Sequence, residues 1–230
     1  RLENLPESSR WYPGAGLYRN VHVIVTENAH IPVWGTYVTT PTATKEFAKV
    51  NVRTQIVLLE GADAGKYSVK TSVWNPNGQK LTEQTIPLSQ IKYNDNSLSQ
   101  EFIIQTPTLW SPDMPALYSA ETRLYEGDQL KDIYTTPFGI RSIEIIPNKG
   151  FFLNGEKTVF KGVCNHHDLG PLGAAVNDAA IRRQIRILKD MGCNAIRTSH
   201  NMPAPELVRA CDEMGMMLMV ESFDEWNKAK

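Results

Sequence analysis

The sequence predicts a multidomain β plus α/β protein, in which an all-β region precedes the start of a parallel α/β domain. Residues 21 to about 140 alternate apolar and polar side chains with a period of two and show almost no helical periodicity. From about residue 150, short apolar strands alternate with helical patterns, as in a parallel sheet covered by helices. The change of pattern therefore predicts two domains of different class.

The all-β region is expected to contain about seven short strands. Residues 21–25 are rich in β-branched side chains, residues 50–58 alternate and then become apolar throughout, and residues 67–74 alternate again. The Asn-Pro-Asn-Gly run at 75–78 and the Glu-Gly-Asp run at 126–128 are typical of tight turns between strands. Such strands, joined by such turns, predict an immunoglobulin-like sandwich.

The α/β region is expected to begin with a strand, a helix, a strand, a helix and a strand. Asp178 is the candidate N-cap of the first helix and Gly192 its end, and the core-facing residues are Ile181, Ile185 and Leu188. The second helix covers 206–214 and is stopped by Gly215. The three strands are expected at 159–163, 194–197 and 216–220, the last of them buried on both faces.

Composition excludes several classes of protein. The chain has 230 residues, 41% of them hydrophobic and 21% charged, as in an ordinary globular protein. A net charge of −1 without charged blocks argues against nucleic acid and anionic membranes as partners, and no apolar run is long enough to cross a bilayer. The three cysteines, at 164, 193 and 211, have no disulfide or zinc spacing and are expected to be buried free thiols.

Polar clusters follow all three predicted parallel strands, at 164–168, 197–201 and 221–226. The carboxyl ends of parallel strands meet at one edge of the sheet, so these clusters are expected to line one cleft. Histidine, arginine and carboxylate groups can bind sugar hydroxyls, and an indole can stack on a pyranose ring. The alternatives are structural histidines and, for 224–226, an exposed loop. His166 and His167 are adjacent and point apart, so no metal or other cofactor is expected.

The two ends of the sequence suggest an excerpt from a longer protein. Arg1 is not an initiator residue, and 225–230 follow an apolar strand without a closing element. About 80 residues remain for the α/β domain, whereas a complete (β/α)₈ barrel needs about 250. Three strands cannot close a barrel, and they are expected to leave an unpaired parallel edge.

Several segments, in the same order along the chain, resemble family 2 of the glycoside hydrolases. The run at 9–21 is similar to the end of the family's N-terminal sugar-binding domain, and the run at 109–118 is similar to its sandwich. The segment that leads into the family's catalytic barrel is similar to the runs at 138–141, 152–156 and 161–163. The second strand of that barrel is similar to the run at 195–200. The resemblance implies three domains: the end of a jelly-roll domain at 1–20, an immunoglobulin-like sandwich at 21–140, and the first strands and helices of a TIM barrel at 141–230.

The resemblance also implies roles for individual residues. His166 and His200 match histidines that contact the sugar, Arg197 matches an arginine that supports the nucleophile, and Glu221 matches a carboxylate that ends the third strand. Weaker candidates for substrate binding are Asp224, Trp226 and Arg10. The family usually has Asn-x-His-Glu-Asp after the first strand, and here Cys164 replaces the Asn and His167 replaces the Glu.

The mechanism implied is retaining hydrolysis of a terminal β-glycosidic bond by two glutamates about 5 Å apart. In the family both lie on later barrel strands, the acid in an Asn-Glu pair, and no such pair occurs after residue 150. The resemblance therefore places no catalytic residue in this chain, and the fragment itself is expected to be inactive. Its role would be to orient the sugar and tune the nucleophile.

Within the family, the runs at 166–170 and 223–226 are most similar to bacterial β-galactosidase-like members. β-Glucuronidase and β-mannosidase are alternatives, and residues 21–140 alone would also suit a non-catalytic carbohydrate-binding or spacer sandwich. Trp34, Trp74 and Trp110 could form a sugar-binding face, but most of them are expected to pack in the core or between domains. A carbohydrate is the expected partner, a homo-oligomer is left open, and a periplasmic or secreted bacterial parent is favoured over a cytoplasmic one.

Overall fold

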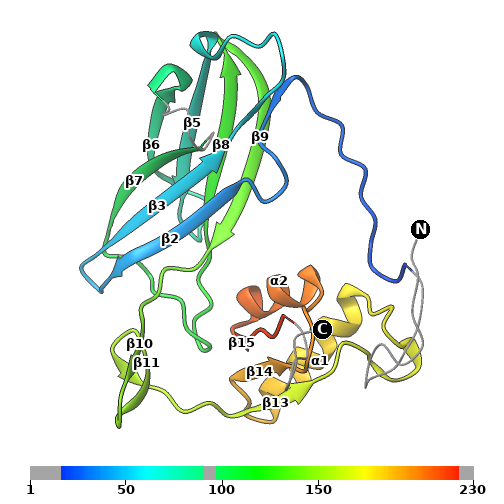
Figure 1. Cartoon of the computed structure of the whole chain (residues 1–230). Coiled ribbons are helices and arrows are strands. Elements are labelled where there is room, and N and C mark those ends of the chain that lie inside the picture. Colours follow the sequence, from blue (N-terminus) through cyan, green and yellow to red (C-terminus); the bar gives the residue numbers. More distant parts are fainter. Residues whose placement is uncertain (1–16, 91–96, 223–230) are drawn as a thin grey trace.

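The computed structural model describes residues 17–90 and 97–222 and places an all-β part beside an α/β part (Figure 1). The all-β part is an immunoglobulin-like sandwich of a three-stranded sheet, in the order β2-β3-β7, and a four-stranded sheet, in the order β6-β5-β8-β9. All pairings within the two sheets are antiparallel. The strands are β2 Thr36–Ala43, β3 Phe47–Gln55, β5 Tyr67–Trp74, β6 Lys80–Pro87, β7 Ser97–Gln105, β8 Tyr118–Glu126 and β9 Gln129–Phe138. The predicted sandwich is confirmed.

The core of the sandwich follows from the alternation of its strands. Along β3, Ala48, Val50 and Val52 are fully buried, whereas the polar residues between them, Lys49 and Asn51, are only half-buried. They pack against Val73 of β5 and Phe102 of β7, so alternate residues of both sheets meet in one layer. A second cluster closes the far end, where the short strands β1 (Ala29–His30) and β4 (Val57–Leu58) pair. The predicted strand at 67–74 coincides with β5, whereas the one predicted at 50–58 begins three residues after the start of β3 and merges β3 with β4.

The predicted turns are also present. The Asn75 side chain accepts hydrogen bonds from the backbone N–H groups of Asn77 (3.0 Å) and Gln79 (2.9 Å), which reverses the chain between β5 and β6. Gly78 adopts a φ of 75°, a conformation that glycine reaches without strain. Residues 126–128 lie at the junction of β8 and β9, as expected.

The predicted strand at 21–25 is wrong. This segment is an extended trace that pairs with no strand among the described residues, and it runs along the outside of the molecule (Figure 1). Val21, Val23 and Val25 are 75%, 89% and 90% exposed. β-Branched residues favour extended backbone, but a strand forms only where a neighbouring strand supplies hydrogen-bond partners.

A small antiparallel sheet, not predicted from the sequence, joins the two parts. It consists of β10 (Ile143–Ile146), β11 (Gly150–Leu153) and β12 (Glu156–Lys157). Its tight turns contain four positive-φ residues, Asn148, Gly150, Asn154 and Gly155. Three short 3₁₀ segments complete the irregular connections, at Ala64–Lys66, Leu88–Gln90 and Gly170–Leu172.

The α/β part is a parallel sheet in the order β13-β14-β15, with helices between its strands. Its elements are β13 Gly162–Asn165, α1 Asp178–Asp190, β14 Ala195–Thr198, α2 Pro205–Met214 and β15 Met217–Met219. Ile181, Ile185 and Leu188 of α1 are buried against Ile196 of β14 and Cys211 of α2, as predicted. A Cβ atom at Gly162 would lie 2.1 Å from the Ala195 carbonyl oxygen, so only glycine permits this approach of β13 to β14.

Several predicted boundaries in this part require correction. The first strand starts at Gly162 rather than at 159, and Val159 and Phe160 are 64% and 48% exposed. The N-cap of α1 is Asn177, not Asp178, since its side chain accepts a hydrogen bond from Ala180 N at 2.9 Å. The third strand is not buried throughout: Met217 is 6% exposed, Leu218 is half-buried and Met219 is 57% exposed, so burial decreases along the strand. The reason is that β15 is an edge strand within the described residues, as is β13.

Trp110 joins the sandwich to the α/β part. It is 1% exposed and packs with Leu153 of β11 and Met217 of β15, while its indole Nε1 donates to the Asp212 carbonyl oxygen at 2.8 Å. The Arg141 guanidinium lies 4.7 Å from the centre of the indole ring. Nearby, the Lys189 ammonium donates to the carbonyl oxygens of Pro112 and Met214 at 2.8 and 2.7 Å.

The helices of the described residues are short, and none combines the length and apolarity that a bilayer-spanning helix requires.

Candidate functional site

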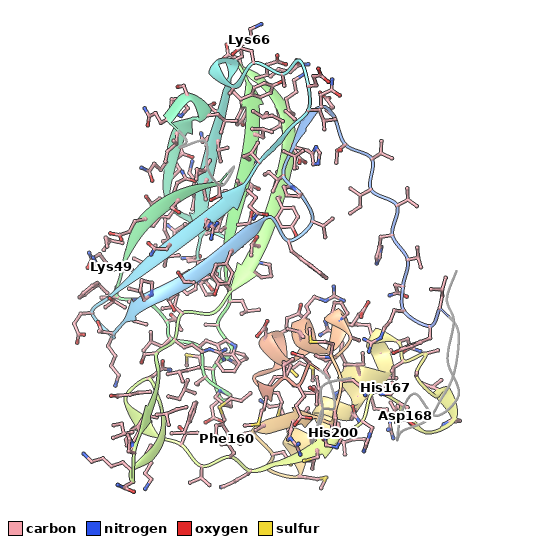
Figure 2. All side chains as sticks on the ribbon, viewed as in Figure 1. Lys49, Lys66, Phe160, His167, Asp168 and His200 are labelled. Atoms are coloured by element: carbon pink, nitrogen blue, oxygen red, sulfur yellow. The ribbon has the colours of Figure 1, made fainter. Side chains whose placement is uncertain are left out.

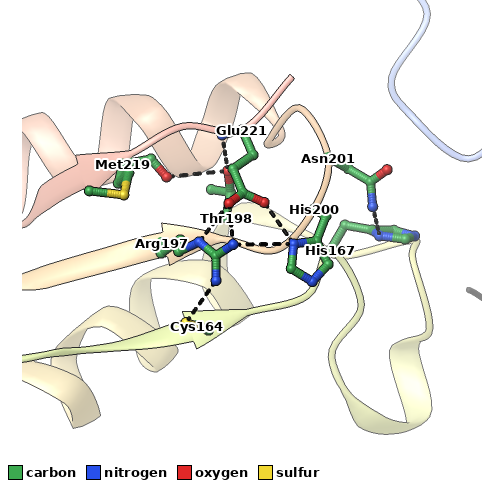
Figure 3. A network of polar contacts seen from close by, with 8 residues as sticks. All are labelled: Cys164, His167, Arg197, Thr198, His200, Asn201, Met219 and Glu221. Atoms are coloured by element: carbon green, nitrogen blue, oxygen red, sulfur yellow. Dashed lines mark hydrogen bonds and ion pairs between the residues drawn. The ribbon is translucent and has the colours of Figure 1, made fainter. Parts of the chain in front are cut away.

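The carboxyl ends of β13, β14 and β15 meet at one edge of the parallel sheet. Figure 3 shows Arg197, His200 and Glu221, which follow or end β14 and β15, turned toward one another. His167, Asp168 and His200 all lie on the α/β part, whereas Lys66 lies at the far end of the sandwich (Figure 2). The parallel topology thus brings together side chains up to 57 positions apart in the sequence, from Cys164 to Glu221.

Arg197 is the centre of the polar contacts. Its Nε donates to Glu221 Oε1 at 2.5 Å, its Nη1 lies 3.6 Å from the Cys164 sulfur, and its Nη2 lies 3.5 Å from His200 Nδ1. The contact with Cys164 and the hydrogen bond to Glu221 raise the pKa of Arg197. The planar guanidinium therefore fixes the relative positions of residues from all three strand ends.

The Glu221 carboxylate interacts with both His200 and Arg197. Its Oε2 lies 2.8 Å from His200 Nδ1, and its Oε1 accepts the hydrogen bond from Arg197 Nε. Its backbone N–H donates to Thr198 Oγ1 at 2.9 Å, which ties β15 to β14. Burial raises the pKa of Glu221, but the hydrogen bonds from His200 and Arg197 outweigh it, so the net pKa is below the ordinary value. An ionised carboxylate held by two donors suits orientation rather than proton donation.

His166 and His200 lie edge to face, with ring centres 5.9 Å apart. His166 follows β13 directly and His200 follows β14 by two residues, so the predicted pair of histidines occupies neighbouring positions on the rim. A rim that carries two imidazoles, a guanidinium and a carboxylate offers several donors and acceptors for hydroxyl groups.

A second group of contacts beside the rim was not predicted. His167 Nδ1 lies 3.1 Å from Asn201 Nδ2, and the His167 ring lies 6.1 Å from that of Tyr18. Arg19 Nη2 donates to the Met202 carbonyl oxygen at 3.3 Å, and Asn20 Nδ2 donates to Glu206 Oε1 at 2.8 Å. The segment before the sandwich thus contacts both rim loops. Local sequence patterns carry no signal for such long-range pairs.

The expectation of three buried thiols is wrong for Cys164, which is exposed and contacts Arg197. Cys211 is buried, and burial raises its pKa to about 12, while Cys193 is half-buried. Position 164 ends up exposed because β13 is an edge strand within the described residues. No disulfide joins the three, in agreement with their spacing.

Of the seven residues proposed for substrate binding, four are described and lie on the rim: His166, Arg197, His200 and Glu221. Their role in sugar binding stays a prediction. The other three, Arg10, Asp224 and Trp226, lie outside the described residues. Among residues 17–90 and 97–222, no group of three or more His, Cys, Asp or Glu side chains is arranged to hold a metal ion.

The three sandwich tryptophans form no exposed row. Trp110 is buried and Trp74 is half-buried, whereas Trp34 is 79% exposed. The prediction that most of them pack in the core or between domains agrees with the buried Trp110 and the half-buried Trp74, and Trp34 is the exception. A single exposed indole among the three does not favour a sugar-binding face on the sandwich.

Two family models match most of the chain. The model described as glycosyl hydrolases family 2 matches residues 29–141, and the TIM barrel domain of the same family matches residues 144–227.

The chain is also similar to named bacterial proteins. It is 43% identical to a β-galactosidase, BoGH2A, of Bacteroides ovatus over the full chain and 27% of that protein. It is 36% identical to a putative β-glucuronidase of Formosa agariphila, over 99% of the chain and 21% of that protein. The chain thus spans about a quarter of the length of these curated relatives.

The chain is also similar to solved structures of bacterial glycosidases. A family 2 glycosyl hydrolase of Bacteroides cellulosilyticus aligns with a TM-score of 0.86 at 38% identity, covering 96% of this chain and 28% of that one. A β-glucuronidase of Bacteroides uniformis aligns with a TM-score of 0.80 at 29% identity, covering 94% of this chain and 27% of that one.

Proposed function

The chain belongs to family 2 of the glycosyl hydrolases, and we propose that it forms the sandwich and the first third of the active-site rim of a retaining exo-β-galactosidase. The observation that carries the proposal is the cluster of Arg197, His200 and Glu221 at the carboxyl ends of neighbouring parallel strands. In a TIM barrel this is the edge where substrates bind.

In this proposal His166 and His200 bind hydroxyl groups of the terminal sugar, and Arg197 and Glu221 hold His200 in place. Arg197 also supports the catalytic nucleophile, which a later barrel strand supplies. Hydrogen bonds to the sugar that strengthen in the transition state lower the barrier to glycosidic cleavage. Arg10, Asp224 and Trp226 are proposed as further contacts with the sugar.

The galactoside specificity is favoured by the 43% identity to BoGH2A over the whole chain. β-Glucuronidase is the second candidate, because several similar proteins carry that name. The two sugars differ at C6, which is a hydroxymethyl group in the galactoside and a carboxylate in the glucuronide, and in the configuration of the C4 hydroxyl. The relatives are bacterial, and the periplasmic or secreted location and the assembly state stay predictions.

The test is a panel of p-nitrophenyl β-glycosides offered to the full-length protein. We expect hydrolysis of the β-galactoside with retention of anomeric configuration, which NMR of the first-formed sugar reports. Hydrolysis of the β-glucuronide alone would overturn the galactoside specificity, and inactivity toward the whole panel would overturn the proposed enzyme. As an internal control, a polypeptide of residues 1–230 should release no nitrophenol, because it lacks the proposed glutamate pair.

A further inference from the structure

A small cavity, partly open to solvent, lies among the loops that follow β13 and β14 and the helices α1 and α2. Its volume is about 40 Å³. Because a site for one water requires about 10–15 Å³, the cavity can hold more than one water molecule. The residues that line it include Asn165, Thr198 and Ser199 at the strand ends, Ile181 and Gln184 of α1, and Leu207 of α2.

Two of the residues that line this cavity each have a buried polar side-chain atom with no hydrogen-bond partner among the described residues. Ser199 is 3% exposed, and its Oγ is buried without a partner. The Asn165 Nδ2 is also buried without a partner. Buried polar groups in folded proteins are nearly always hydrogen-bonded, to protein or to ordered water. Two such groups, in residues that line one cavity of sufficient size, point to a ligand there with both donor and acceptor capacity.

The same two residues connect the two rim loops. The Ser199 backbone N–H donates to the Asn165 carbonyl oxygen at 2.8 Å. Asn165 immediately precedes His166, and Ser199 immediately precedes His200, whose rings are in edge-to-face contact. Any ligand that bridges the Asn165 and Ser199 side chains therefore braces the backbone that carries both histidines.

We propose that the cavity binds ordered water through Ser199 Oγ and Asn165 Nδ2, and that Ser199 is a positioning residue for His166 and His200. Water is the ligand of the right size, and it can donate to the hydroxyl and accept from the amide. The cavity and the two unpartnered groups are the only observations that the proposed water site needs. Its effect on catalysis rests on the proposed function.

The first test is a crystal structure of the full-length protein at a resolution that shows ordered water. We expect density for at least one water within hydrogen-bond distance of both Ser199 Oγ and Asn165 Nδ2. An empty cavity, or density for water that contacts neither atom, would overturn the proposal. This measurement is independent of any enzymatic activity.

The second test uses the sign of a stability change. If Ser199 Oγ binds water, Ser199→Ala removes a satisfied hydroxyl and lowers the thermal midpoint of the full-length protein. If the hydroxyl is unsatisfied, its removal raises the midpoint, and the proposal is wrong. Ser99→Ala is the matched control, because Ser99 is exposed on β7 and its hydroxyl faces solvent; this variant should leave the midpoint unchanged.

The positioning role has its own readout. If Ser199 positions His166 and His200, Ser199→Ala leaves both side chains less well oriented toward the substrate. This variant should therefore lower kcat/KM for the hydrolysed glycoside by about tenfold. Ser199→Thr, which keeps the hydroxyl, should recover part of that loss. If Ser199→Ala loses the ordered water of the cavity but keeps the kcat/KM of the unmodified protein, the positioning role is wrong. Absence of any glycosidase activity in the unmodified protein would instead count against the proposed function, and the crystallographic and thermal tests would still decide the water site.

Discussion

Single residues at the rim were predictable where topology alone determines their position. Arg197 lies near the end of β14 and Glu221 follows β15, so the rule that the ends of neighbouring parallel strands converge was sufficient to predict that both lie on one rim. The pairing of His167 with Asn201 depends on loop conformation, which no periodicity encodes. The N-cap was missed by one residue because Asn177 and Asp178 both have cap-forming side chains, and only the backbone geometry distinguishes them.

The ion pairs of Glu221 predict a pH-dependent contribution to stability. Its pKa is lowered in the folded protein, so its stabilising effect is present above the unfolded pKa and is lost as the pH falls through the folded pKa. Glu221→Gln, which cannot ionise, should lower the thermal midpoint of the full-length protein by a few degrees near pH 7. The difference from the unmodified protein should shrink as the pH falls below about 4.3, the ordinary glutamate value.

The control for this effect is Glu144→Gln on the exposed strand β10. It should shift the midpoint little at any pH. A difference between the unmodified protein and Glu221→Gln that grows on acidification would contradict the assigned role of Arg197 and His200 as partners of an ionised Glu221.

Whole elements were predicted well where burial alternates along them. The strand at 67–74 and the helix ending before Gly215 match the structure, since each has one apolar face and clear boundary residues. The segment 21–25 and the sheet β10-β11-β12 were not predicted correctly. Strand formation depends on a partner, and neither the absence of one for 21–25 nor the short-range pairing around Asn148 and Asn154 can be inferred from apolar content.

The cap of α1 allows a test at the scale of one element. Asn177→Ala removes the side-chain acceptor for Ala180 N and should destabilise the helix by about 1 kcal/mol. The amides of 178–190 in the full-length protein should then exchange with deuterium about fivefold faster, since 1.4 kcal/mol corresponds to tenfold. Hydrogen exchange followed by mass spectrometry measures this change.

Asn177→Asp is the matched variant, because aspartate caps a helix as well as asparagine does. It should exchange at the rate of the unmodified protein. Equal acceleration in both variants would show that the side-chain acceptor is not what stabilises the first turn.

At the scale of the whole molecule, the junction between the two parts is built around one buried side chain. Trp110 follows β7 in the sandwich, yet it contacts Leu153 and Met217 and donates to a carbonyl of α2. Gly139 lies so close that a Cβ there would be 2.9 Å from the indole side chain. The sequence predicted that most of the sandwich tryptophans pack in the core or between domains, but it could not single out Trp110, since burial depends on how the two parts meet.

Trp110 therefore supports the last prediction, that the orientation of the sandwich on the barrel depends on this indole. Trp110→Ala should destabilise the junction by about 3–5 kcal/mol, the range for truncating a buried large aromatic side chain. Trp110→Phe keeps a ring beneath Arg141 but loses the hydrogen bond to Asp212, so it should cost less. Limited proteolysis of the full-length protein should cut Trp110→Ala faster within 139–161, and Trp34→Ala, at an exposed indole, should be cut at the unmodified rate. Equal resistance of Trp110→Ala and Trp34→Ala would mean that the small sheet β10-β11-β12 and the contacts of Lys189 hold the junction without the indole.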